Sequence, residues 1–221
     1  MPRKKRLVVP NCPHHVLHRG HDGEAVFLGD DDYRYYLDNL WTGAQELGCK
    51  VYAYCLLLSK VHLIVDPGEN LANLGRLMKI VAGRQAGYAK RRGMLNGAPL
   101  WERRFRFSPI VTNGFLLACN RYVELSPVHA CLAKLPDEYI WSSCRTKLGL
   151  DSAIIHSDPA YLALGQTLAE RVEYYRCYLT QRVPHQEWEA IRHAIQAGTF
   201  TGLLLANNGE REEPAMAPLA I

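Results

Sequence analysis

Apolar residues recur at helical spacing in three parts of the first 150 residues. One series follows the acidic triplet at positions 30–32 and ends at Gly48, and a second runs from residue 71 to residue 92. A third series covers residues 115–125 and is stopped by Pro127. We predict an amphipathic helix in each of these segments.

Segments rich in β-forming residues separate these helices. Residues 7–9 and 15–18 predict the start and the body of a first strand, which the turn-forming residues 19–23 end. Residues 51–65 are apolar enough for a buried strand or a hairpin arm. Residues 101–107 alternate as a strand does, and residues 139–143 predict a short closing segment.

This order of elements predicts an α+β fold, with a ferredoxin-like antiparallel sheet and helices packed on it. We expect one domain over residues 1–150. Residues 151–197 are expected to form a small helical C-terminal extension, because 159–197 keeps a helical apolar pattern. Residues 198–221 lose this pattern and are expected to form a disordered tail.

Composition places the chain among globular proteins. Its 221 residues, 48% of them hydrophobic, can form a real core, which excludes disorder, collagen and coiled coil. No stretch approaches the ~18 uninterrupted apolar residues of a membrane span, and the N-terminus lacks the apolar run of a signal peptide. The 7 cysteines contain no C-x-x-C pair. We therefore expect a cytoplasmic protein with reduced thiols and no membrane partner.

Charge is distributed unevenly along the chain. Residues 1–113 carry 17 Lys and Arg against 10 Asp and Glu, whereas residues 114–221 carry 9 against 12. Between Arg76 and Arg106 there are nine cations and one anion, Glu102. This local excess indicates a polyanionic partner, nucleic acid first, although a solvated helix face with a basic turn has the same charge pattern.

Two pairs of residues could each share a site. Lys60 and His62 are two residues apart in a predicted strand, so their side chains lie on one face of the sheet. A buried lysine normally has an anion or a carboxylate partner, whereas a lone histidine is more often part of the core. Tyr122 and Ser126 are four residues apart and face one direction on the third predicted helix, where a tyrosine is usually a core residue.

Other candidate residues have simpler interpretations. Trp101 and Phe105 could stack on an unpaired base, although Trp101 fits a core position better. Glu124 is expected to pair with Arg121 across one helical turn. The early histidines lack the spacing of a zinc site and are expected to occupy an exposed strand and loop; they are His14, His15, His18 and His21.

Over residues 5–150 the sequence resembles the REP-associated tyrosine transposases, relatives of transposases that move single-stranded insertion sequences. The resemblance rests on short stretches that occur in the family's order. They are Pro13-His14-His15-Val16 with Arg19-Gly20, Asp31-Asp32-Tyr33, Ala53-Tyr54, Val61-His62-Leu63, Leu100-Trp101-Glu102-Arg103-Arg104-Phe105, Arg121-Tyr122-Val123-Glu124-Leu125-Ser126-Pro127-Val128 and Tyr139-Ile140-Trp141-Ser142-Ser143.

The resemblance implies a mechanism and its residues. In the family, a His-hydrophobic-His pair binds a divalent metal, Mg²⁺ or Mn²⁺, and a helix tyrosine attacks a DNA phosphate to form a 5′-phosphotyrosine link. By position, Tyr122 is the nucleophile and His62 is the second histidine. This chain has Lys60 in place of the first histidine and Ser126 in place of an asparagine that helps to hold the metal. His62 alone is a poor basis for a site for a hard cation.

The replacements at Lys60 and Ser126 allow two interpretations, and a third hypothesis assigns the chain a function other than DNA binding. In the first, Lys60 takes the place of the metal and contacts the phosphate, so that Tyr122 cleaves and rejoins single-stranded or hairpin DNA. In the second, the chain has lost catalysis and binds DNA hairpins only. In the third, the same scaffold is an RNA-binding module. A nucleoid-associated, cytoplasmic location is expected for the first two.

Basic residues are expected to contact the nucleic acid backbone in two groups. The N-terminal residues Arg3, Lys4, Lys5 and Arg6 would follow a groove or a single strand. Cations around the site would bind backbone phosphate; these are Arg19, Lys60, Lys90, Arg91, Arg92, Arg103, Arg104 and Arg106.

Overall fold

The computed structural model describes residues 8–152 and 155–200, so residues 3–6 and most of the expected tail lie outside the described residues. The first half contains β1 (His14–Arg19), η1 (His21–Gly23), α1 (Asp30–Leu47), β2 (Lys50–Leu57), β3 (Lys60–Asp66), α2 (Ala72–Arg91) and β4 (Arg106–Pro109). Short and medium helices follow: α3 (Asn113–Glu124), α4 (Ser126–His129), η2 (Pro136–Glu138), α5 (Cys144–Lys147), α6 (Pro159–Leu162), α7 (Leu168–Thr180) and α8 (His185–Ala197).

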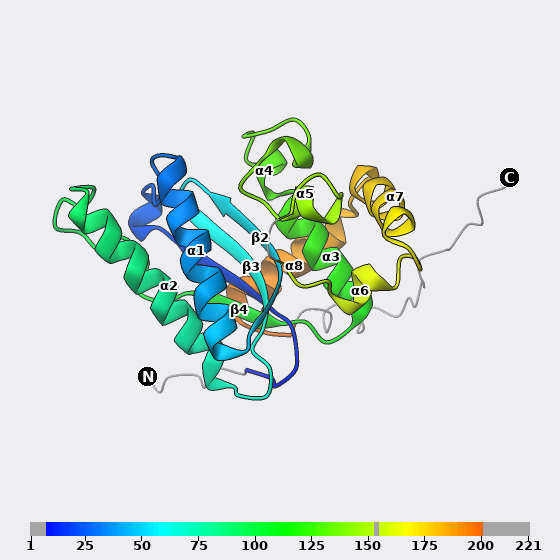
Figure 1. The fold of residues 1–221 in the computed structure, drawn as a ribbon, viewed down its shortest axis with the longest axis horizontal. Coiled ribbons are helices and arrows are strands. Elements are labelled where there is room, and N and C mark those ends of the chain that lie inside the picture. Colours follow the sequence, from blue (N-terminus) through cyan, green and yellow to red (C-terminus); the bar gives the residue numbers. More distant parts are fainter. Residues whose placement is uncertain (1–7, 153–154, 201–221) are drawn as a thin grey trace, which may run out of the picture.

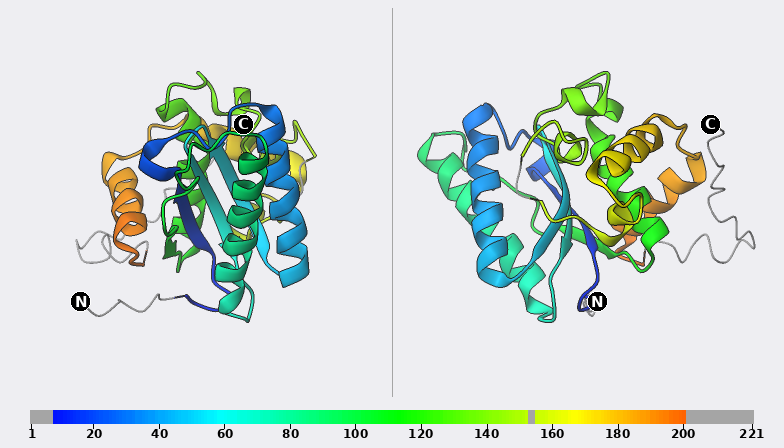
Figure 2. Two further views of the ribbon diagram at one scale, coloured as in Figure 1. Left: turned by 90° about the vertical axis from the view of Figure 1, so that its left-hand side faces the viewer. Right: turned by 45° about the vertical axis from the view of Figure 1, so that its right-hand side comes forward.

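The four strands form one antiparallel sheet in the order β2-β3-β1-β4. With α1 and α2 as the two connections, this is the ferredoxin-like α+β arrangement that the sequence predicted. Helices α1 and α2 cover one face of the sheet, and α3 and α8 lie on the other (Figures 1 and 2). The sheet is therefore buried on both faces. Among the described residues, no helix is long and apolar enough to cross a membrane.

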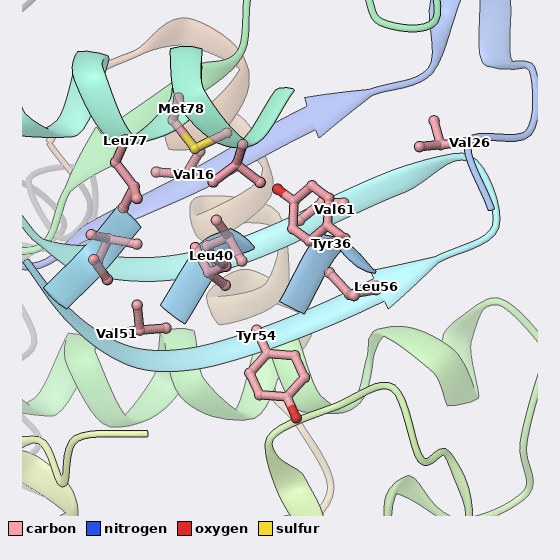
Figure 3. Packing of buried hydrophobic residues seen from close by; sticks show 14 of the residues in the cluster. Val16, Val26, Tyr36, Leu40, Val51, Tyr54, Leu56, Val61, Leu77 and Met78 are labelled. Carbon is pink, nitrogen blue, oxygen red and sulfur yellow. The ribbon is translucent and has the colours of Figure 1, made fainter. Parts of the chain in front are cut away.

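Alternation along the strands assigns each side chain to a face. Val16, Val61 and Leu56 pack with Leu40 and Leu77 in the core between the sheet and its two long helices (Figure 3). On the opposite face, Ala53, Cys55 and Ile64 pack with Leu116, Cys119 and Val123 of α3. His15 and His62 belong to this second face, which therefore carries the candidate chemistry.

The structure differs from the predicted strands at two places. Residues 8 and 9 are not in a strand, because Pro10 and Pro13 cannot donate ladder hydrogen bonds and Asn11 turns the chain at a φ of 49°. The last strand begins at Arg106 rather than Trp101. Trp101 pairs with Gly20, and Arg106 pairs with Leu17. Four residues lie between Trp101 and Arg106 but only two between Gly20 and Leu17, so the hydrogen-bond ladder between β1 and this segment is interrupted.

Pro127 also has a different role from the predicted one. It lies in the first turn of α4, immediately after α3 ends at Glu124, and so begins a short helix. The predicted helical stretch 159–197 is divided into α6, α7 and α8. The early histidines were predicted to be exposed, which is wrong for His14, His15 and His18, whose side chains are buried.

A buried carboxylate at the end of α3 joins the sheet domain to the helices that follow. Glu124 is fully buried and accepts hydrogen bonds of 2.6 Å from the Ser143 hydroxyl and of 2.6 Å from the Tyr175 hydroxyl. The Lys147 ammonium lies 3.3 Å from the same carboxylate. The expected pairing of Glu124 with Arg121 is wrong, since Arg121 pairs instead with Glu187 of α8 at 2.7 Å.

Lys147 extends this network to α6. Its ammonium is 3.7 Å from the buried Asp158 carboxylate, which accepts a 2.8 Å hydrogen bond from the Asn120 amide of α3. Asp158 also caps α6 by accepting from the Tyr161 amide. One cation therefore lies between two buried carboxylates: Glu124 at the end of α3, and Asp158, which binds Asn120 one turn earlier in the same helix.

We predict that Lys147→Met destabilises the fold by about 3–5 kcal/mol, because it leaves two buried carboxylates without their cation. The free energy of unfolding from urea titration measures this effect. Lys50→Met is the matched control, since Lys50 is exposed, and it should change stability by less than about 0.5 kcal/mol. A Lys147→Met protein as stable as the control would contradict the role given to this network.

Candidate functional site

The candidate site lies on the sheet face that α3 covers, where β1 and β3 run side by side. In the register of these strands Leu17 is opposite His62 and Arg19 is opposite Lys60. His15 Nε2 and His62 Nδ1 are 2.9 Å apart and form a hydrogen bond between two buried imidazoles. The structure thus gives His62 a histidine neighbour, which comes from the adjacent strand and not from position 60.

Burial keeps both imidazoles neutral. It lowers the pKa of His15 to about 3 and the pKa of His62 well below its usual value. The charges of Lys60 and Arg19 lower the pKa of His62 further. In a neutral pair one ring donates and the other accepts, so a single N–H joins the two facing nitrogens.

Tyr122 reaches this pair from the last full turn of α3. Its ring centroid is 5.5 Å from that of His15 and 5.8 Å from that of His62, and both contacts are edge-on. The tyrosine is 8% exposed. Burial raises the pKa of its phenol, while the charges of Arg192 and Arg19 act in the opposite direction.

Trp188 of α8 covers the other side of Tyr122. The two ring centroids are 4.2 Å apart, and the ring centroid of His129 in α4 is 3.8 Å from that of Trp188. The ion pair between the buried Arg121 and the partly buried Glu187 holds α8 beside α3. The C-terminal extension therefore contributes a wall of the site, which no local sequence pattern predicts.

Lys60 and Ser126 occupy different environments. Lys60 is half-buried at the end of β3, and burial together with the charge of Arg19 lowers the pKa of its ammonium. The Ser126 hydroxyl donates a 2.8 Å hydrogen bond to the backbone carbonyl of Tyr122 and so closes the turn between α3 and α4. Lys60 is available to an anion, whereas the Ser126 hydroxyl is already used within the helix.

The residues around His62 do not fit a Mg²⁺ or Mn²⁺ ion. These ions need several oxygen ligands, but the neighbours of His62 include the His15 imidazole, the Cys55 thiol, the Tyr122 ring and the Lys60 ammonium. The facing nitrogens of the two imidazoles bind each other. Across residues 8–152 and 155–200, no three His, Cys, Asp or Glu side chains come together as a metal site.

The structure separates the basic residues into two groups. The first group, Arg19, Lys60 and Arg106, lies on the sheet face that carries His62. Arg106 belongs to this face because it pairs with Leu17 of β1, and Leu17 pairs on its other side with His62 of β3. The other group lies beside α2 on the opposite side of the sheet and comprises Lys90, Arg91, Arg92, Arg103 and Arg104. Within this group Arg92 is engaged with the buried Asp32 at 2.9 Å.

Sequence reasoning missed two residues of this site, His15 and Trp188. The signal for His15 was its position in a predicted strand beside the one that carries His62, but its face depends on the register between the strands. Trp188 is 66 positions from Tyr122 in the sequence and carries no local motif.

Comparison with known proteins shows the fold of the chain. No protein-family profile and no curated protein matches the sequence. A solved REP-associated tyrosine transposase bound to a REP hairpin aligns with a TM-score of 0.58 and 14% identity, covering 72% of this chain and 93% of that protein. A candidate transposase from Deinococcus radiodurans aligns with a TM-score of 0.37 and 19% identity, over 56% of this chain and 96% of its own, which is too distant to compare folds. The chain therefore has a transposase-like fold.

We predict that acidification destabilises the protein partly through His15. Its pKa is lowered in the folded state, so its contribution to stability is complete above about pH 6.5 and is lost as the pH falls toward the folded value. Between about pH 6 and pH 4.5, His15→Gln should reduce the pH dependence of the unfolding free energy by up to about 1.4 kcal/mol per pH unit. Urea titrations at several pH values measure this slope.

The control for this prediction is His193→Gln, which removes an exposed imidazole from α8. An equal pH dependence in the native chain and in His15→Gln would mean that His15 is not held in a buried neutral form.

Proposed function

We propose that this protein binds single-stranded or hairpin DNA and that Tyr122 cleaves and rejoins it without a bound metal ion. The observation that carries the proposal is the position of the Tyr122 ring over the His15–His62 pair, on the face that also presents Lys60 and Arg19. The transposase-like fold and the resemblance of the sequence motifs support the same activity.

The proposed step transfers a DNA phosphoryl group to the phenol. The Tyr122 oxygen attacks phosphorus and forms a phosphotyrosine bond, while the bond from phosphorus to the 3′ oxygen breaks. The phenol loses its proton and the departing 3′ oxygen gains one, so no cofactor is consumed. Attack by a 3′-hydroxyl on the phosphotyrosine reverses the step and rejoins the strands.

Lys60 and Arg19 would supply the positive charge that this step needs. They lie opposite each other in adjacent strands, and burial together with the charge of Arg19 lowers the pKa of Lys60. A scissile phosphate placed between them would relieve this repulsion and have its developing charge stabilised. The neutral, hydrogen-bonded histidine pair would contact the Tyr122 ring without adding charge to the site.

A second function, DNA binding without chemistry, is favoured by one observation. The Trp188 ring packs at 4.2 Å from the Tyr122 ring, and burial raises the pKa of the phenol, so both access to Tyr122 and its ionisation are reduced in this conformation. A protein that only binds hairpins has no need for an accessible phenolate. The two functions differ in whether a covalent adduct forms.

We predict that the protein forms a covalent adduct with a labelled hairpin oligonucleotide carrying a single-stranded flank, and that EDTA does not prevent it. Lys60→Met should reduce the rate of adduct formation by about 10²–10³-fold, because it removes one preorganised charge from the transition state. Denaturing gel electrophoresis of time courses measures the rate. Lys50→Met, which changes an exposed lysine at the far end of the hairpin arm, is the matched control.

Two further variants separate the alternatives. Tyr122→Phe should abolish the adduct and leave hairpin affinity within about twofold of the native value. If native protein binds the hairpin but forms no adduct, while Lys60→His with Ser126→Asn forms one in Mn²⁺, the chain is a DNA-binding derivative with a lost metal site. An adduct that requires added Mn²⁺ in the native chain would overturn the metal-independent mechanism.

A further inference from the structure

A groove of about 680 Å³ runs along α2 on the opposite side of the sheet from Tyr122. One wall is α2, and the other is the segment from residue 99 to residue 105 that leads into β4. Its lining is mostly apolar, with Met78, Leu95 and Trp101 among the residues that form it. The groove is open to solvent and lies outside the candidate site described above.

At three positions where α2 lines the groove the residue is glycine, so no side chain enters the groove there. Gly75, Gly83 and Gly87 lie on one stripe of the helix, and a Cβ atom at Gly75 or Gly83 would meet nothing within 4 Å. Each glycine within a helix costs about 1 kcal/mol relative to alanine. Packing within the described residues does not account for this cost at Gly75 and Gly83, because the space beside these two glycines is empty, whereas a Cβ atom at Gly87 would lie 3.5 Å from the Arg91 guanidinium.

The rim of the groove is strongly cationic. Lys79 and Lys90 project from α2, and Arg103 and Arg104 from the facing segment, against one anion, Glu102. All four cations are exposed, and none of them forms an ion pair with another of the described residues. The positive charge therefore remains uncompensated along both edges.

A buried polar side chain also lines this groove. His18 is 5% exposed, and its ring stacks on that of Trp101 with centroids 4.3 Å apart. Its Nε2 lies 3.3 Å from the Glu102 carbonyl, but its Nδ1 has no hydrogen-bond partner among the described residues. His18 and Trp101 thus form a stacked aromatic pair in the wall of the groove.

We propose that the groove binds a single-stranded DNA segment, with bases against its apolar walls and phosphates along its cationic rim. Single-stranded nucleic acid has this combination of flat apolar faces and regularly spaced negative charge, which a neutral peptide or an acidic protein surface lacks. The stripe from Gly75 to Lys90 extends for ~22 Å along α2, enough for several nucleotides. The missing side chains allow the strand to approach the helix backbone closely.

The groove is also joined to the Tyr122 face at one end of the sheet. The Glu102 amide donates a 2.9 Å hydrogen bond to the Arg19 carbonyl, and Trp101 forms a bridge with Gly20. The Arg19 side chain points to the other face, opposite Lys60. A strand that leaves the groove at this end would meet Arg19 and Lys60 first, so the proposal extends the proposed function by assigning a place for the single-stranded flank.

The test is the affinity of the full chain for an oligothymidine of about ten nucleotides, measured by fluorescence anisotropy. Gly83→Leu fills the groove from an exposed helix position and should weaken binding about tenfold or more. Lys79→Gln with Arg104→Gln should reduce the slope of log affinity against log salt by about 1.4. The controls are Gly114→Leu, at an open helical position outside the groove, and Arg76→Gln, an exposed cation of α2 that does not line it.

These measurements test DNA binding in the groove independently of adduct formation at Tyr122. Loss of affinity in both groove variants and not in the controls would support the groove even if Tyr122 formed no adduct. Unchanged affinity in the groove variants, or no binding of oligothymidine by the native chain, would overturn it even if Tyr122 did form one. Tighter binding of oligouridine than of oligothymidine would overturn the assignment to DNA.

Discussion

The buried ion network around Glu124 is the interaction on which the rest of the site depends. Glu124 ends α3, only two residues after Tyr122, and its carboxylate is held by Ser143 and Lys147 at the two ends of α5 and by Tyr175 of α7. A charge in this position is tolerated only with its partners present, because an unpaired buried carboxylate is costly. The network therefore ties the last turn of α3 to the helices that follow, and with it the direction of Tyr122.

This constraint explains why the site includes residues distant in sequence. Once α3 is held against the sheet, Tyr122 faces the two imidazoles that adjacent strands present on that side. The same packing brings α8 alongside, where the Arg121–Glu187 ion pair places Trp188 against the phenol. The result is a site with buried, neutral histidines and with cations at its edge, which suits stabilisation of an anionic phosphate better than coordination of a hard metal ion.

The sequence predicted the sheet domain well because its elements have strong local patterns. The spacing of apolar residues located α1 and α2, and the order of elements led to the ferredoxin-like arrangement. Local patterns could not supply strand register or contacts across the sheet, so His15 and Trp188 were missed. Prolines at positions 10 and 13 explain why Val8 and Val9 form no strand. Position in family motifs, rather than spacing alone, identified Tyr122, His62 and Lys60 as candidates.

The most direct test of the central claim is to identify the atom that carries DNA after reaction. Native protein is incubated with a hairpin oligonucleotide in EDTA and digested with protease and nuclease, and the peptides are sequenced by mass spectrometry. We expect a nucleotide mass on Tyr122 in the peptide that spans α3. A nucleotide on any other residue, or an unmodified Tyr122 peptide from protein that has bound the hairpin, would show that Tyr122 is not the nucleophile.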